Sequence, residues 1–314
     1  MLPHIDDFLL NLEAGHYSPY TVHDYERYLE VFDHFLNESS VPFDKINKQT
    51  IASYKAYLAS RGRNTAKPGN HSDRQLAPST MNYKLIALRA YLRYLMDIDY
   101  PCPLAPEALK LLKAVPKKPQ VPELEDLIRL IEAPSHKSNI MELRDKAILE
   151  TLLNTGLRVS ELVSLNRDQV DLKRQEFALK GKGNKIRIVF LSNTVVECIR
   201  RYLQSRRDHF EPLFIRYSGN VDARKSGEKK RLTVRSIQNI VTKYAKRCGS
   251  PIKATPHTLR RCFAIYLAEA GANPAALQII LEHESFADTT RYVHASDKYA
   301  EETYHRYYPL AKPE

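Results

Sequence analysis

The sequence predicts a mainly α-helical protein of two domains, the second of which also contains a small β-sheet. Apolar residues recur at every third or fourth position through most of the 314 residues, which is the period of a helix that buries one face. The period changes to two at residues 177–190, as in a β-hairpin. Residues 116–122 contain three prolines, and proline cannot continue a helix. We therefore expect a helical bundle at 1–115, a linker at 116–122 and a larger domain at 123–314.

The first domain is predicted from two amphipathic stripes. Ser18 and Pro19 suit the start of a helix, and a second helix over residues 48–61 is expected to stop at Gly62. A further helix is expected to begin with Ser79 as its N-cap. The stripes of the first and last of these helices are Tyr25, Leu29, Phe32 and Leu36, and Leu85, Leu88, Leu92 and Leu95.

Two connecting segments complete the first domain. Residues 68–79 are rich in turn-forming residues and predict a polar loop. Residues 107–115 follow a proline-rich stretch and predict a short helix.

The second domain is predicted to be mixed. Phe177 and Leu179, then Ile186, Ile188 and Phe190, alternate with polar residues on either side of a glycine-containing turn, which predicts a hairpin with a loop of more than two residues. Several helices and a basic loop are expected around it. The helices are 124–133, 142–156, 158–165, 255–271 and one that begins at Asn273 and Pro274, and the loop is 216–231.

The charge is unevenly distributed between the two parts. The net charge is +11, with 15 Lys and Arg against 13 Asp and Glu in residues 1–119, and 33 against 24 in residues 120–314. A basic excess favours a polyanion such as nucleic acid as partner, although a solvated basic surface has the same composition.

Other function classes are poorly supported. No apolar run approaches the ~20 residues needed to span a bilayer, and the acidic N-terminus lacks the features of a secretory signal. The four cysteines have no CxxC spacing, so neither a metal site nor a disulfide framework is expected. We expect a cytoplasmic protein without cofactors.

A candidate anion site lies at the start of the helix 255–271. Thr255 is its expected N-cap, and Pro256 occupies the first helical position. His257 and Arg260 are three residues apart and share one face. The helix N-terminus favours an anion, and arginine donates bidentately to phosphate oxygens. The pair predicts a phosphate clamp, although an ordinary surface pair has the same spacing.

Further candidates are each compatible, on their own, with an ordinary surface or packing role. Arg158 follows a helix end, and Glu161 is placed to hold it in position. Lys182 lies at the tip of the predicted hairpin, from which a flexible ammonium can reach a site. His283 falls at the end of one predicted helix, and Tyr292 falls in the first turn of the next.

The order of these residues is more informative than any one of them. With the words TGLRVSEL, GKGNKIR, HTLR and LEHESFADTTRYVH, it resembles the tyrosine recombinase, or phage integrase-like, family, and most of all its Xer site-specific recombinases. The segments SPYTVHDYERYLEVF and STMNYKLIALRAYLRYL resemble the SAM-like core-binding domain of that family. Two positions depart from the family pattern, because Arg261 stands where histidine is usual and Glu282 where glycine is usual.

The resemblance implies a fold and a chemistry. The fold is a helical core DNA-binding domain followed by a mostly helical catalytic domain with a small β-sheet. Tyr292 would attack a DNA phosphate and form a covalent 3′-phosphotyrosyl link, without metal or cofactor, while Glu161 supports the site. The implied catalytic residues are Arg158, Lys182, His257, Arg260, His283 and Tyr292. Tyrosines 299, 304, 307 and 308 lie beyond the Thr-Thr-x-Tyr-x-His pattern that singles out Tyr292.

The resemblance also implies partners. These are double-stranded DNA with a specific recombination site, and a homo-tetramer, or a hetero-tetramer with a second recombinase, joined through the C-terminal tail on two DNA sites. A DNA translocase could act as activator. Two alternatives remain open, namely a type IB topoisomerase-like activity that relaxes DNA and a non-catalytic DNA-binding relative.

Overall fold

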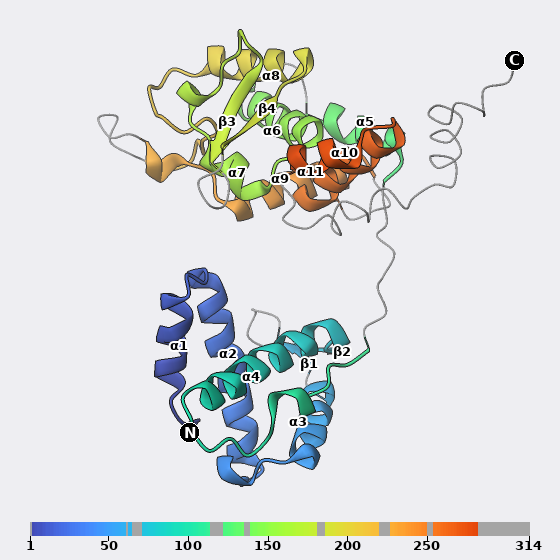
Figure 1. Ribbon diagram of the computed structural model, residues 1–314. Helices are drawn as coiled ribbons and strands as arrows, with labels where there is room; N and C mark the ends of the chain where they lie inside the picture. The colour runs from blue at the N-terminus through green and yellow to red at the C-terminus, as the bar shows by residue number, and fades with distance from the viewer. Residues whose placement is uncertain are drawn as a thin grey trace, which may run out of the picture. The chain divides into compact units, whose positions relative to one another are not determined.

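Figure 1 shows the computed structural model of the protein, which describes residues 2–60, 62–64, 71–113, 122–134, 139–180, 186–219, 227–249 and 254–281. The chain divides into two compact units, Met1–Lys118 and Pro119–Glu314. The described parts of both units are mostly helical, and each contains one two-stranded antiparallel sheet. The predicted mainly helical fold class is confirmed. No described helix is both long enough and apolar enough to cross a membrane.

The described residues of the first unit form a bundle of four α-helices, α1 (Ile5–Ala14), α2 (Pro19–Glu38), α3 (Lys48–Ser60) and α4 (Pro78–Asp97). The predicted start of α2 is confirmed, because Ser18 is its N-cap and accepts a hydrogen bond from the backbone N–H of Thr21 at 3.1 Å. The predicted leucines of α4 and Leu29, Phe32 and Leu36 of α2 are buried in one core. Tyr54 of α3 closes that core with its ring edge-on to Phe32, at 4.8 Å between ring centroids.

Two predictions for the start of α4 were wrong. Part of the polar loop expected at 68–79 instead forms strand β2 (His71–Gln75), which pairs antiparallel with β1 (Gly62–Asn64), just after the expected helix end. Backbone pairing satisfies the peptide groups of these segments without an apolar pattern, so their polarity did not reveal them. The helix then begins two residues earlier than expected, with Ala77 as N-cap and Pro78 at the first position. Proline suits that position because its missing N–H would have no partner within the helix.

The predicted helix at 107–115 was also wrong. The chain forms a 3₁₀ turn, η2 (Pro106–Ala108), and then runs without regular structure through Lys113. Side chains of α3 and α4 form hydrogen bonds with the backbone of this segment instead. Asn82 accepts from the N–H of Leu112 at 2.8 Å and donates to its carbonyl at 3.0 Å. Arg89 donates to the Leu109 carbonyl. These tertiary bonds replace the bonds that a helix would have made.

The second unit surrounds one central helix. Its longer helices are α5 (Leu124–Glu132), α6 (Ile140–Thr155), α8 (Asn193–Ser205), α9 (Val234–Arg247) and α10 (Pro256–Glu269); the shorter ones are α7 (Val159–Ser164) and α11 (Pro274–Leu281). In the described part of this unit, the 3₁₀ turns η3 (Arg167–Gln169) and η5 (Glu228–Lys230) lie between them. Helix α6 packs against α5, α8, α9 and α10, and every residue from Arg144 to Leu152 is buried.

The predicted hairpin is present as β3 (Glu176–Lys180) and β4 (Ile186–Phe190), paired antiparallel. Phe177 and Leu179 of β3 face the core, opposite Val189 and Arg187 of β4. The apolar residues Ile186, Ile188 and Phe190 point outward and are exposed. An arginine therefore occupies an inward position on β4, with only 9% of its side chain exposed.

Candidate active site

The site is built on the sharp turn that ends α6. Gly156 is the C-cap of α6 and adopts the left-handed conformation, with φ at 61°. A Cβ atom at this position would lie 2.4 Å from Cδ1 of Phe263 on α10, so both the conformation and the close packing of α10 require glycine. The turn delivers the chain from α6 to Arg158, the N-cap of α7.

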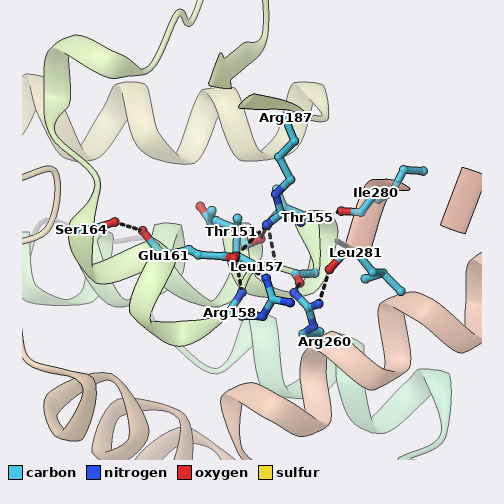
Figure 2. Close-up of polar contacts among 11 residues, drawn as sticks. Thr151, Thr155, Leu157, Arg158, Glu161, Ser164, Arg187, Arg260, Ile280 and Leu281 are labelled. Atoms are coloured by element: carbon cyan, nitrogen blue, oxygen red, sulfur yellow. Dashed lines mark hydrogen bonds and ion pairs between the residues drawn. The ribbon is translucent and has the colours of Figure 1, made fainter. Parts of the chain in front are cut away.

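Glu161 holds Arg158 by its backbone and by its side chain. The backbone N–H of Arg158 donates to Oε2 of Glu161 at 2.7 Å, and its Nη1 donates to Oε1 at 2.8 Å. A glutamate at the third helical position reaching back to the N-cap N–H is one half of a capping box. The side chain of Arg158 is 40% exposed, and Figure 2 shows it beside the Glu161 carboxylate that sets its direction.

Arg260 approaches the same turn from α10. Its Nη1 donates to the carbonyl oxygen of Gly156 at 2.7 Å, and its Nη2 donates to the carbonyl oxygen of Leu281, the last residue of α11. The residue is 6% exposed. Figure 2 shows Arg158 and Arg260 together at this turn. The structure thus brings together two guanidinium groups that the sequence separates by about a hundred residues, the charge pattern that a phosphate requires.

His257 lies in the first turn of the same helix. The predicted helix start is confirmed, since the Thr255 hydroxyl accepts from the N–H of Thr258 at 3.1 Å and Pro256 follows the cap. Partial desolvation of the ring, and then the positive charges of Arg261 and Arg260, lower the pKa of His257 below its ordinary value of 6.5. Arg261, a departure from the family pattern, thereby favours the neutral imidazole.

Lys182, His283 and Tyr292 lie outside the described residues, as does Glu282. The described segments next to Lys182 and His283 contact the turn from Gly156 to Arg158 together with Glu161 and Arg260, which we call the arginine turn. Strand β4, which begins four residues after Lys182, contacts Glu161 through Arg187. The carbonyl oxygen of Leu281, two residues before His283, accepts from Arg260.

Sequence reasoning missed Arg187. It donates from Nη2 to Oε2 of Glu161 at 2.7 Å and from Nη1 to the carbonyl oxygen of Ile280 at 2.8 Å. The pattern of β4 did not reveal it, because apolar residues at the alternate positions Ile186, Ile188 and Phe190 predict that Arg187 faces solvent, whereas the structure exposes those residues. Among the described residues there is no cluster of three or more His, Cys, Asp or Glu side chains that could hold a metal ion.

Comparisons with known proteins agree with this architecture. The model of the phage integrase family matches residues 122–299, and that of the phage integrase SAM-like domain matches residues 2–100. The chain is 32% identical to tyrosine recombinase XerC of Thermodesulfovibrio yellowstonii, over 98% of this chain and 97% of the relative. It is 30% identical to tyrosine recombinase XerC of Pelobacter propionicus, over 99% and 97% of the two chains.

Solved structures show the same fold. The crystal structure of XerA recombinase is 26% identical, covers 98% of both chains and superposes with a TM-score of 0.51. The Tn1549 transposon integrase in complex with transposon right end DNA is 18% identical, covers 98% of this chain and 99% of that one, and superposes with a TM-score of 0.70.

The fold and these matches define a DNA breaking–rejoining enzyme of the tyrosine recombinase type. The chain belongs to the phage integrase family, and full-length relatives at about 30% identity are Xer recombinases. The resemblance noted in the sequence is confirmed.

Proposed function

We propose that Arg158 and Arg260 hold the scissile phosphate of a recombination site while Tyr292 attacks it. The observation that carries this proposal is the meeting of the two arginines at the Gly156 turn, one held by Glu161 and the other by two backbone carbonyls. Charge builds on the non-bridging oxygens in the transition state, and donors whose orientation is already fixed stabilise that charge at little reorganisation cost. His283 is proposed as a further donor.

The remaining roles follow from proton balance. The Tyr292 oxygen forms a bond to phosphorus, and the bond from phosphorus to the 5′ oxygen breaks. A tyrosine has a pKa near 10, so its proton must leave, and His257 is the proposed acceptor. The lowered pKa of His257 keeps it unprotonated at neutral pH, as a base requires. Lys182 is proposed to protonate the departing 5′ oxygen, which leaves a 3′-phosphotyrosyl link and a 5′-hydroxyl.

The proposal extends to partners and place. Structures of similar fold are recombinases bound to DNA, and the net charge of +11 suits a phosphate backbone. We propose that the domain at 1–115 and the catalytic domain at 123–314 both contact double-stranded DNA at a specific site. Strand exchange between two sites would take a tetramer, of this chain alone or with a second recombinase, joined through the C-terminal tail. A DNA translocase as activator and a cytoplasmic location complete the proposal.

Covalent trapping tests the chemistry. Wild type, Tyr292→Phe and the control Tyr299→Phe would be mixed with nicked duplexes that carry a site selected by the full-length protein from a randomised duplex pool. We expect a protein–DNA band on denaturing gels from wild type and Tyr299→Phe only, with DNA binding kept by all three. No band from wild type on a duplex that it binds would favour the non-catalytic alternative. A band that is lost in Tyr299→Phe but kept in Tyr292→Phe would identify Tyr299 as the nucleophile instead.

Two further measurements separate the alternatives. Relaxation of a supercoiled plasmid without the selected site would favour the type IB topoisomerase-like activity. The affinity for the selected duplex should fall by orders of magnitude as salt rises, because each neutralised phosphate releases condensed counterions. An affinity that is insensitive to salt would contradict phosphate-dominated binding.

A further inference from the structure

Strand β4 carries a buried arginine that the proposed chemistry does not use. Arg187 faces the core opposite Leu179. An apolar side chain at this inward position would pack against the core without burying a charge. Only 9% of its side chain is exposed. Its Nε atom is buried and has no hydrogen-bond acceptor among the described residues. Burying a guanidinium with one unsatisfied donor costs stability, so packing alone does not explain an arginine at this place.

The partners of Arg187 are parts of the arginine turn. Its Nη2 donates to Oε2 of Glu161 at 2.7 Å, the same oxygen that accepts the backbone N–H of Arg158 at 2.7 Å. The other carboxylate oxygen of Glu161 accepts Nη1 of Arg158 at 2.8 Å. Glu161 therefore lies between two arginines, one buried and one 40% exposed, and the buried one fixes the carboxylate that directs the exposed one (Figure 2).

Arg187 also reaches the end of α11. Its Nη1 donates to the carbonyl oxygen of Ile280 at 2.8 Å, while Arg260 donates to the next carbonyl, that of Leu281. The last carbonyls of a helix have no partner within the helix, and two arginines from different elements bind them here. Arg187 thus joins β4, the start of α7 and the end of α11.

We propose that Arg187 is a positioning residue of the recombinase, acting through Glu161 on the guanidinium of Arg158. The inference rests on the proposed function, because it assumes that Arg158 binds the scissile phosphate. Without Arg187, the Glu161 carboxylate can turn toward solvent, and Arg158 loses its fixed direction while keeping its charge. Misplacing a catalytic group by about 1 Å can cost about 100-fold in rate.

Single-turnover cleavage of the nicked duplex with the selected site tests this role. Arg187→Lys keeps a charge but cannot donate to Glu161 and Ile280 in the same fork geometry, and Arg187→Met removes the donors while keeping much of the stem. We expect cleavage to slow by about 10-fold to 100-fold in both. The matched control is Arg206→Lys, which alters another buried arginine that binds a carboxylate, Asp208, and backbone carbonyls. It should cleave at nearly the wild-type rate.

Two readouts distinguish positioning from loss of fold. Because Arg187 acts through Glu161, the double variant Arg187→Met/Glu161→Ala should cleave no more slowly than the slower single variant. A methylphosphonate at the scissile position removes the negative charge that Arg158 neutralises. The defects of Arg158→Ala and of the Arg187 variants should therefore shrink together on that substrate.

The outcomes are separable. Wild-type rates in both Arg187 variants, multiplicative defects in the double variant, or an Arg187 defect unchanged on the methylphosphonate would each overturn the positioning role while leaving the proposed function intact. If Arg187→Met does not fold, Arg187→Lys carries the same comparisons. Wild type that binds the duplex but forms no covalent product would overturn the proposed function, and this inference with it.

Discussion

Replacing Gly156 by alanine should destabilise the catalytic unit more than a left-handed glycine normally would. An alanine held at φ near 61° costs about 1–2 kcal/mol in backbone strain. Its Cβ would lie 2.4 Å from Cδ1 and 2.9 Å from Cε1 of Phe263, and overpacking of that kind costs about 1–3 kcal/mol. The smaller entropy of the unfolded alanine chain offsets about 0.5 kcal/mol. We expect a loss of about 3 kcal/mol in the free energy of unfolding.

Gly249 supplies the matched control. It follows α9 with φ at 68°, but a Cβ there would have no atom within 4 Å. Gly249→Ala should therefore show the conformational cost alone, about 1 kcal/mol. The assay is urea unfolding followed by the helical circular dichroism signal, since the chain has no tryptophan.

The comparison of Gly156→Ala with Gly249→Ala shows whether contact with Phe263 adds to the loss of stability. A larger loss in Gly156→Ala than in Gly249→Ala measures the steric contribution of Phe263, and Phe263→Leu in the Gly156→Ala background should recover part of it. Equal losses in the two glycine variants would refute the steric argument. Because the Gly156 carbonyl accepts from Arg260, Gly156→Ala should also slow cleavage.

Three further predictions concern buried or titrating groups. Asp145 is 2% exposed and accepts hydrogen bonds from Arg144 and from the Tyr244 hydroxyl. Asp145→Ala leaves a buried guanidinium without its carboxylate, so the free energy of unfolding in urea should fall by about 3–5 kcal/mol. A loss under about 1 kcal/mol would contradict the pairing. Burial raises the pKa of the Cys262 thiol to about 11, so iodoacetamide should label it at neutral pH only after urea unfolds the chain, and rapid labelling of the native protein would argue against this burial. The pKa of His257 is lowered from 6.5 in the native chain. Between the native and the unfolded pKa of this residue, the unfolded chain therefore binds more protons than the native one. The contribution of His257 to stability should then fall as pH drops below about 6.5. His257→Gln should reduce that slope in pH-dependent unfolding, and an unchanged slope would contradict the assignment.

Local signals predicted the helices that position the site. The Thr255–Pro256 start of α10 and the glycine end of α6 were read from capping chemistry, which depends on a few adjacent residues. The predicted helix at 107–115 failed for the opposite reason. Its backbone is bound by Asn82 and Arg89 of α4, and such tertiary partners are not visible in the pattern of the segment itself.

The site was predicted as a set of residues but not as a network. The order of the motifs predicted Arg158 and Arg260 as site residues, and spacing alone suggested Glu161 as the partner of Arg158. Arg187 was not found in that way, although it ends the word GKGNKIR, because it lies 26 residues from Glu161. Its role depends on which face of β4 turns inward, and a strand with apolar residues at the alternate positions predicts the wrong face.

The central position of α6 has a consequence for how the enzyme loses activity. Amide protons in a helix buried on all sides exchange only when the whole domain opens, whereas those near exposed ends exchange through local fraying. Arg158 follows directly from the end of α6, and Arg260 is bonded to that end. The pair proposed to bind phosphate is thus attached to the part of the domain that we expect to exchange most slowly, so partial opening at its edges should leave the pair assembled. Heat or denaturant should abolish phosphate binding by the two arginines in the same transition that releases the amides of α6.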